Sequence, residues 1–129
     1  MTEVPTGSIR LELERASQAL TSARILVDAG QYADAISRAY YAMFHAACAL
    51  LASIGRSART HDGVRALVSE HFIRSGMMAH EHGRALSRMS GDRNDADYNV
   101  AALFSEQDAR EDVALAEAFL LEASRLVDA

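Results

Sequence analysis

Apolar residues recur every three or four positions along most of the chain, which is the periodicity of an amphipathic helix. The pattern is densest between residues 36 and 54, where one stripe consists of Ile36, Tyr40, Met43, Ala47, Leu50 and Ile54. A second row on the same stretch consists of Asp34, Arg38, Tyr41, His45 and Cys48. A helix that is apolar over more than one face is usually surrounded by other helices. We therefore expect a central helix from Tyr32 to just before Gly55.

Both ends of the chain carry apolar residues at heptad-like spacing, which is typical of helices packed against one another. The first helix is expected from about Ser8 to Ala29, where Gly30 provides a C-terminal stop. The last helix is expected to begin at Ser105, because Ser-Glu-Gln-Asp has the form of a capping arrangement. With the central helix between them, these segments predict an all-α, up-and-down bundle of four to five helices.

The pattern is weaker between the central and last helices. Thr60 is a natural N-cap for a third helix from His61 to about Arg74, and Ser75-Gly76 ends it. A fourth helix follows to about Met89. Residues 90–99, Ser-Gly-Asp-Arg-Asn-Asp-Ala-Asp-Tyr-Asn, lack apolar periodicity, so they predict a polar loop.

The length of 129 residues supports one domain with one core, residues 8–129, after a short tail of residues 1–7. No apolar run approaches the roughly 18 residues that span a bilayer. Cys48 is the sole cysteine and suits a reducing cytoplasm, where we interpret it as a small core residue. The expected buried positions are Leu13, Leu20, Ile36, Tyr40, Met43, Val113 and Leu120.

The formal net charge of −5 argues against a general nucleic-acid-binding protein, which would normally be basic. The charge is uneven, however, because residues 55–93 hold seven Arg against four acidic residues. Residues 105–129 hold two Arg against seven acidic residues. Every cationic side chain is Arg, whose planar fork matches phosphate. The middle third of the chain is therefore the expected anion-facing surface.

Three places could carry chemistry, and each has a plainer structural interpretation. The Arg38, Tyr41 and His45 row could instead be hydrogen-bonded inside the bundle. Arg59-Thr60-His61 could bind an anion at a helix N-terminus or serve only as a cap. Residues 92–98 could form a site or a hydrogen-bonded turn. The histidines lack the spacing of a zinc helix, since His80 and His82 are two apart, so we expect no metal and no cofactor.

The order of these segments resembles the HEPN superfamily, whose name stands for higher eukaryotes and prokaryotes nucleotide-binding. The likeness consists of Ala-Tyr-Tyr-Ala-Met-Phe-His-Ala-Ala from residue 39, the Thr60-His61 pair, and Arg-x-x-Ala-Asp-Tyr from Arg93. It covers about residues 8–127. The resemblance implies a four- or five-helix bundle that is commonly dimeric. Many members are metal-independent ribonucleases, and many small prokaryotic members are encoded with a minimal nucleotidyltransferase as toxin–antitoxin pairs.

The family's ribonuclease motif is an Arg followed by a His five to seven positions later. Arg93 and Asn94 match its start, but Tyr98, Asn99 and Val100 occupy the positions of the His. Metal-free RNA cleavage needs a base and a cation, and a phenol with a pKa near 10 is a poor base. The candidate catalytic residues are Arg93, Tyr98 and His45, and the candidate phosphate-binding residues are Arg38, Tyr41, Arg59, His61 and Asp97.

The sequence thus favours the HEPN half of a two-gene system that binds RNA or nucleotides, with slow or no cleavage by the protein alone. A non-catalytic helical interaction module remains the alternative. Apolar residues beyond one stripe of the central helix (Phe44, Leu51 and Ala46) predict a homodimer. We further expect Asp97 to hold Arg93 in a cleft lined by Tyr41 and His45. The hydroxyl of Tyr98 is also a candidate acceptor for a nucleotidyl group from the partner enzyme.

Overall fold

The computed structural model describes residues 7–128, and within this range every regular element is helical. The elements are α1 (Gly7–Asp28), α2 (Tyr32–Ser53), α3 (His61–Val68), the π-helical turn η1 (Ser69–Ile73), α4 (His80–Tyr98) and α5 (Glu106–Asp128). The expected tail of residues 1–7 falls almost entirely outside the described residues. The order of the elements confirms the all-α prediction.

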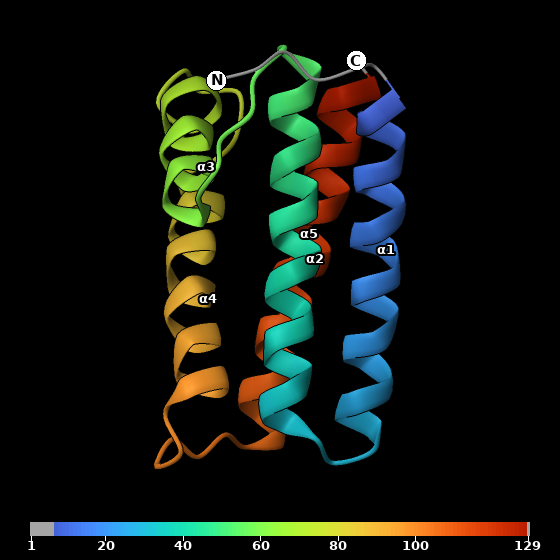
Figure 1. Cartoon of the computed structure of the whole chain (residues 1–129), viewed down its shortest axis with the longest axis vertical. Coiled ribbons are helices and arrows are strands. Elements are labelled where there is room, and N and C mark those ends of the chain that lie inside the picture. The colour runs from blue at the N-terminus through green and yellow to red at the C-terminus, as the bar shows by residue number, and fades with distance from the viewer. Residues whose placement is uncertain (1–6, 129) are drawn as a thin grey trace.

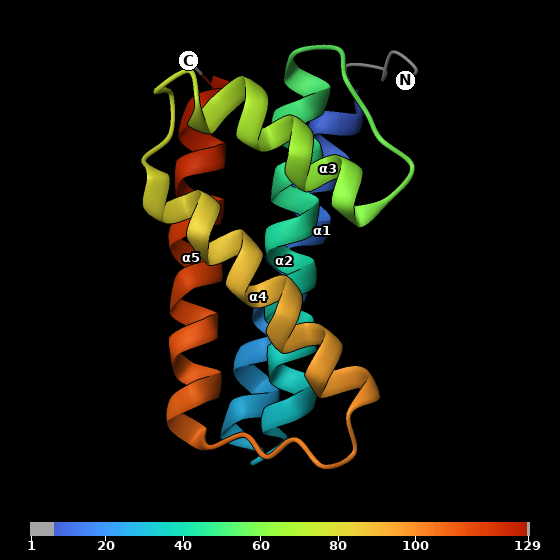
Figure 2. The same ribbon diagram turned by 90° about the vertical axis from the view of Figure 1, so that its left-hand side faces the viewer.

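Helix α2 lies at the centre of the bundle. Helices α1, α2 and α5 run side by side along the long axis, and α3 and α4 cover one side of α2 (Figure 1). Seen from that side, α4 crosses obliquely over α2 and α5, with α3 beyond its N-terminal end (Figure 2). Helix α2 contacts α1, α3, α4 and α5. The central position predicted from its apolar pattern is therefore confirmed.

The core consists largely of one face from each helix around α2. Ile36, Tyr40 and Met43 are fully buried, and Leu20 and Val113 are also buried. The prediction was less accurate for two further residues. Leu13 and Leu120 are only half-buried, because they line an open groove between α1 and α5.

The helix ends follow local signals in the sequence. Gly30 has a φ of 77°, a left-handed conformation that favours glycine after a helix. The hydroxyl of Thr60 accepts a hydrogen bond from the backbone N–H of Gly63 at 2.9 Å, as expected for an N-cap. Ser105 and Asp108 each accept the other's backbone N–H, so they form the predicted reciprocal cap of α5.

The predicted polar loop at residues 90–99 is wrong, because α4 continues through it to Tyr98. The residues that face the bundle along this stretch share one face of the helix and are Met89, Ser90, Arg93 and Ala96. Ser90 and Arg93 are polar, so a hydropathy pattern does not register them as an inward face. Ion pairs Arg88–Asp92 and Arg93–Asp97, each four residues apart, further stabilise this helix.

The surplus apolar residues of α2 are covered within the bundle. Ala46 and Leu51 are buried, and Phe44 is half-buried against His61. The argument for a dimer from these three residues therefore loses its basis. Among the described residues, no helix is both long and apolar enough to cross a membrane.

Candidate functional site

Arg93 projects from α4 toward α2 and is mostly buried, with 13% of its side chain exposed. Its guanidinium carbon lies 5.0 Å from the ring centre of Tyr40 and 5.9 Å from that of Tyr41. Nη1 is 3.8 Å from Oδ2 of Asp97, which confirms the expected pairing with that carboxylate. Nε is buried without a hydrogen-bond partner. The guanidinium is thus held in place while part of its donor fork is unused.

His61 opens α3 and faces both α2 and α4. Its Nδ1 lies 2.8 Å from the hydroxyl of Tyr40 and 3.5 Å from Nη2 of Arg93. Tyr40 is fully buried, so its hydroxyl needs a partner, and His61 provides one. These three residues come from three different helices. We call them the Arg93–His61 cluster, with Tyr40 as its third member.

The contacts of Nδ1 fix the tautomer of neutral His61. A guanidinium can only donate hydrogen bonds, so the nitrogen that faces Arg93 must carry the lone pair. The hydroxyl of Tyr40 consequently donates to the same nitrogen. The proton of the neutral ring therefore resides on Nε2, which can donate a hydrogen bond to a ligand.

Burial and nearby cations set the ionisation of the cluster. Burial and the neighbouring Arg93 lower the pKa of His61, since both disfavour the imidazolium. Burial also raises the pKa of Tyr40, although Arg93 partly opposes this. At neutral pH the cluster thus combines a neutral His, a neutral Tyr and one Arg cation.

The ring of His61 also stacks on Phe44, with centroids 4.2 Å apart and planes 16° apart.

Arg38 and Tyr41 lie beside this cluster on α2. The guanidinium carbon of Arg38 is 4.7 Å from the ring centre of Tyr41, within the range of a cation–π contact. Arg38 is exposed, and Tyr41 also lies edge-on to His61 with centroids 6.1 Å apart. Five of the predicted site residues are therefore brought together: Arg38, Tyr41, His61, Arg93 and Asp97.

Arg65 is a member of this neighbourhood that the sequence analysis missed. It follows His61 by four residues on α3, pairs with Asp62, and has a buried Nε without a hydrogen-bond partner. Its charge lowers the pKa of both His61 and Tyr40, although burial is the larger effect on each. The spacing of four from His61 was the signal that could have identified it, because such residues share a helix face.

His45 lies apart from Arg93 and has a different partner. Its Nδ1 is 2.8 Å from Oε2 of Glu12 on α1, and its ring meets Phe44 edge-on. The same Glu12 lines a small pocket of about 220 Å³ together with Cys48. Burial raises the pKa of the Cys48 thiol to about 12. Glu12 was also missed, since its contact with His45 depends on the packing of α1 against α2.

Tyr98 and Arg59 do not join the cluster. Tyr98 is 76% exposed at the end of α4. Because a helix turns 100° per residue, Tyr98 points about 140° away from Arg93, whereas Asp97 lies on nearly the same face. Arg59 is exposed in the loop before α3. Both residues remain candidates by sequence, but neither takes part in the contacts made by Arg93 and His61.

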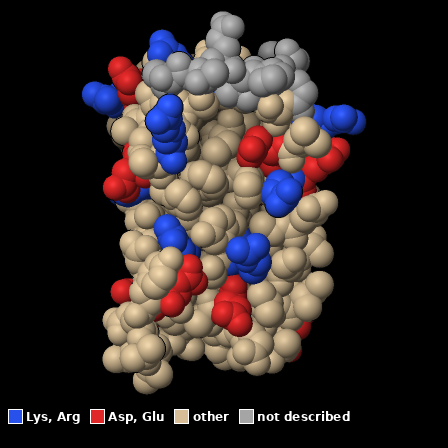
Figure 3. Space-filling model, viewed as in Figure 1, with Lys and Arg blue, Asp and Glu red and all other residues tan. Residues whose placement is uncertain are grey.

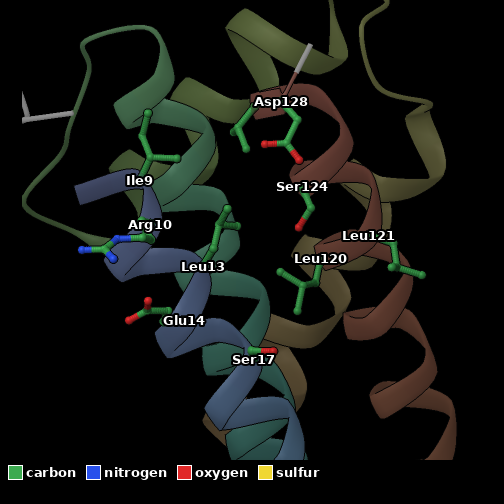
Figure 4. A pocket seen from close by; sticks show the side chains of 10 residues that line it. Ile9, Arg10, Leu13, Glu14, Ser17, Leu120, Leu121, Ser124 and Asp128 are labelled. Atoms are coloured by element: carbon green, nitrogen blue, oxygen red, sulfur yellow. The ribbon is translucent and has the colours of Figure 1, made fainter. Parts of the chain in front are cut away.

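A mostly apolar groove lies elsewhere on the bundle. It has a volume of about 670 Å³ between the N-terminal half of α1 and the C-terminal half of α5. Figure 4 shows Leu13 and Leu120 facing each other across it, with Arg10, Glu14 and Asp128 at its edges. On the face seen in Figure 3, basic and acidic side chains are interspersed. This face therefore carries no extended basic patch.

The family profile of the HEPN domain matches residues 9–126. The chain belongs to the HEPN-domain family. This match covers all of the helices that carry the Arg93–His61 cluster. It also agrees with the resemblance that the sequence motifs indicated. Within residues 7–128, no group of three or more His, Cys, Asp or Glu side chains is arranged to hold a metal ion.

Relatives of this HEPN protein come from bacteria and archaea. A UPF0332 protein of Thermotoga maritima is 32% identical over 114 residues, covering 88% of this chain and 86% of the relative. A protein of Methanocaldococcus jannaschii with the name "Putative toxin" is 32% identical over 120 residues, covering 93% and 84%. A UPF0332 protein of Gloeobacter violaceus is 35% identical over 109 residues, covering 84% and 86%.

Proposed function

We propose that this HEPN protein is the toxin-like component of a cytoplasmic two-gene system and binds a phosphate group of RNA or a nucleotide at the Arg93–His61 cluster. The observation that carries the proposal is the state of Arg93. Its guanidinium lies against two aromatic rings, and Nη1 is 3.8 Å from the Asp97 oxygen, too far for a hydrogen bond. A positioned cation with unused donors is a natural phosphate ligand.

Two neighbouring groups complete the binding chemistry. Nε2–H of His61 adds a neutral donor that keeps its proton across the neutral range. Arg38 lies exposed against Tyr41, so its planar fork is open to solvent. Two cations and one neutral donor therefore lie around the ring of Tyr41. An aromatic ring beside them offers a surface on which a base can stack.

Binding is better supported than cleavage. RNA cleavage without a metal needs a base that removes the 2′-hydroxyl proton. Nδ1 of His61 already accepts from Tyr40, and Tyr98 points away from Arg93. His45 is engaged with Glu12. We therefore propose slow or no ribonuclease activity for the protein alone.

We propose a nucleotidyltransferase-fold protein as the partner of this chain, with Tyr98 as the group on which it acts. The exposed phenol of Tyr98 favours this role. Its oxygen would attack the α-phosphorus of a nucleoside triphosphate, pyrophosphate would leave, and the phenolic proton would pass to the partner's base. The name of the M. jannaschii relative supports a toxin-like role. The covalent nucleotide would add negative charge at the C-terminal end of α4.

A homodimer is also part of this proposal. The exposed apolar side chains Leu11 on α1 and Leu121 on α5 provide surface for self-association. Light scattering at micromolar concentration should report twice the chain mass of 14.0 kDa. A mass that stays at that of one chain would count against the dimer.

The binding proposal is tested with a fluorescein-labelled single-stranded RNA and fluorescence anisotropy at low salt. Arg93→Ala should weaken binding by roughly tenfold, the equivalent of one charge-assisted hydrogen bond. It should also lower the slope of log affinity against log salt by about 0.7. Arg84→Ala, which removes an exposed Arg from the same helix, is the matched control and should leave both unchanged. Equal effects of the two substitutions, or no binding at all, would favour the interaction module.

A further inference from the structure

Asp112 on α5 is a fully buried acidic residue. Neither of its carboxyl oxygens accepts a hydrogen bond from an N–H or hydroxyl group. An ionised carboxylate in such a place would be strongly destabilising, because burial removes its hydration. A side chain with this cost needs either a close cation or a proton of its own.

The nearest cation cannot neutralise Asp112 alone. Nη2 of Arg88 lies 3.5 Å from Oδ1 of Asp112, too far for a good hydrogen bond. The same guanidinium lies 3.2 Å from Glu111 and 3.6 Å from Asp92. One positive charge is thus shared among three carboxyl groups. If all three were ionised, this small region would carry an excess of negative charge.

The groups around Asp112 favour a proton on it. Burial, followed by the neighbouring Asp92, raises the pKa of Asp112 to about 8, against the smaller opposing effect of Arg88. Asp108, on the same helix, acts in the same direction as Asp92. From α2, the one titratable group among the buried residues is Tyr40, which faces His61.

The charged residues of α1 that reach α5 pair elsewhere. Arg24 pairs with Glu117, and Asp28 pairs with Arg110. The acidic excess at Asp112 is therefore a property of the seam between α4 and α5. Arg88 lies within 3.6 Å of both Asp92 and Asp112, so the two carboxyl groups flank one guanidinium. Neighbouring carboxyl groups commonly retain one proton between them.

We propose that Asp92 and Asp112 share one proton across the α4–α5 seam and that this proton positions Arg93 for ligand binding. Asp92 immediately precedes Arg93 on α4, so a hydrogen bond from one carboxyl group to the other fixes the part of α4 that holds Arg93. Removal of the proton by hydroxide leaves two facing carboxylates, whose repulsion pushes α4 away from α5. Asp112 is therefore a positioning residue for Arg93. This role rests on the proposed function, which is phosphate binding at the Arg93–His61 cluster.

The first test is thermal unfolding between pH 6 and pH 9. Burial raises the pKa of Asp112 in the native state to about 8, whereas unfolded aspartates release their proton near pH 4. The unfolded state therefore binds fewer protons, so stability must fall as pH rises toward 8. The melting temperature of the wild type should fall across this range. The melting temperature of Asp112→Asn should fall less, so it should rise relative to that of the wild type as the pH increases.

Glu14→Gln is the matched control, because it removes one exposed carboxylate from α1. Its melting temperature should follow that of the wild type at every pH. If Asp112→Asn also stays parallel to the wild type, no proton is shared and the proposal is overturned. This outcome does not depend on any ligand.

The second test is RNA binding at constant salt between pH 7 and pH 9. His61 is neutral throughout this window, since its pKa is lowered. Wild-type affinity should fall severalfold, whereas Asp112→Asn should keep its affinity because an amide can still donate to Asp92. Asp112→Leu, which cannot, should bind weakly at every pH. Equal binding by the Asn and Leu variants would overturn the positioning role.

The two tests separate this inference from the proposed function. If no variant binds RNA, the proposed function and the positioning role both fail. The melting profiles would still decide whether the proton is shared. If RNA binds with a pH dependence identical in wild type and Asp112→Asn, the proposed function stands and the positioning role is overturned.

Discussion

The hydroxyl of Tyr40 donates to Nδ1 of His61 across the contact between α2 and α3. The apolar pattern had assigned Tyr40 to the core, and its ring does lie there. Its hydroxyl adds a second role, because it determines which nitrogen of His61 carries the proton. A single residue thus connects the packing of the bundle with the chemistry of its candidate site.

Tyr40→Phe should therefore change His61 more than it changes the fold. We expect the free energy of unfolding to fall by about 0.5–1.5 kcal/mol, the usual net value of one hydrogen bond. The side-chain ¹⁵N spectrum of His61 should show a clear Nε2–H tautomer in the wild type and a mixture in the variant. An unchanged tautomer in Tyr40→Phe would mean that Arg93 alone determines it.

His61 should make the fold less stable in acid. Its pKa is lowered in the native state by burial and by Arg93, whereas that of an unfolded histidine is about 6.5. As pH falls below this value the unfolded state binds the proton first, so stability is lost on acidification. Urea unfolding should show that the free energy of unfolding differs less between pH 7 and pH 5 for His61→Gln than for the wild type. A larger difference would contradict the assignment.

Met43→Ala should strongly destabilise the protein. Met43 is fully buried on α2, so truncation leaves a cavity in the middle of the bundle. Comparable core truncations lower the free energy of unfolding by roughly 2–5 kcal/mol. Met77→Ala is the control, because Met77 is 50% exposed and its truncation should change the free energy of unfolding little. Similar urea midpoints for the two variants would mean that the core can collapse around the missing side chain.

Tyr98 should be the modified residue when the protein is produced with its genomic neighbour. Intact mass spectrometry should detect one added nucleotide per chain, and Tyr98→Phe should remove it. Tyr32→Phe controls for other phenols, because Tyr32 is half-buried at the start of α2. A nucleotide that remains on Tyr98→Phe would place the modification on another residue.

The sequence was informative where local chemistry decides the structure. Thr60 and Ser105 cap the helices that were expected to start there, and Gly30 follows α1. The pairing of Arg93 with Asp97 was also correct, although for a partly wrong reason. The residues were expected to meet in a loop, and they meet because they lie four apart on a helix.

The parts that the sequence did not predict depend on contacts between helices. The inward face of α4 is polar because it meets Tyr40 and His61, so its periodicity is visible only once those partners are known. Glu12 contacts His45 from α1, although it precedes His45 by 33 residues in the chain. Arg65 belongs to the site because α3 packs over α2. Local patterns contain no record of such neighbours.

The raised pKa of half-buried Cys48 has a practical consequence for attaching a probe to α4. Alkylating reagents react with the thiolate, and burial keeps this sulfur protonated well above neutral pH. A new cysteine on the surface would therefore react with a maleimide dye far faster than the native one. Ser87→Cys, at an exposed position of α4, would place a single fluorophore on the helix that carries Arg93 without a cysteine-free background.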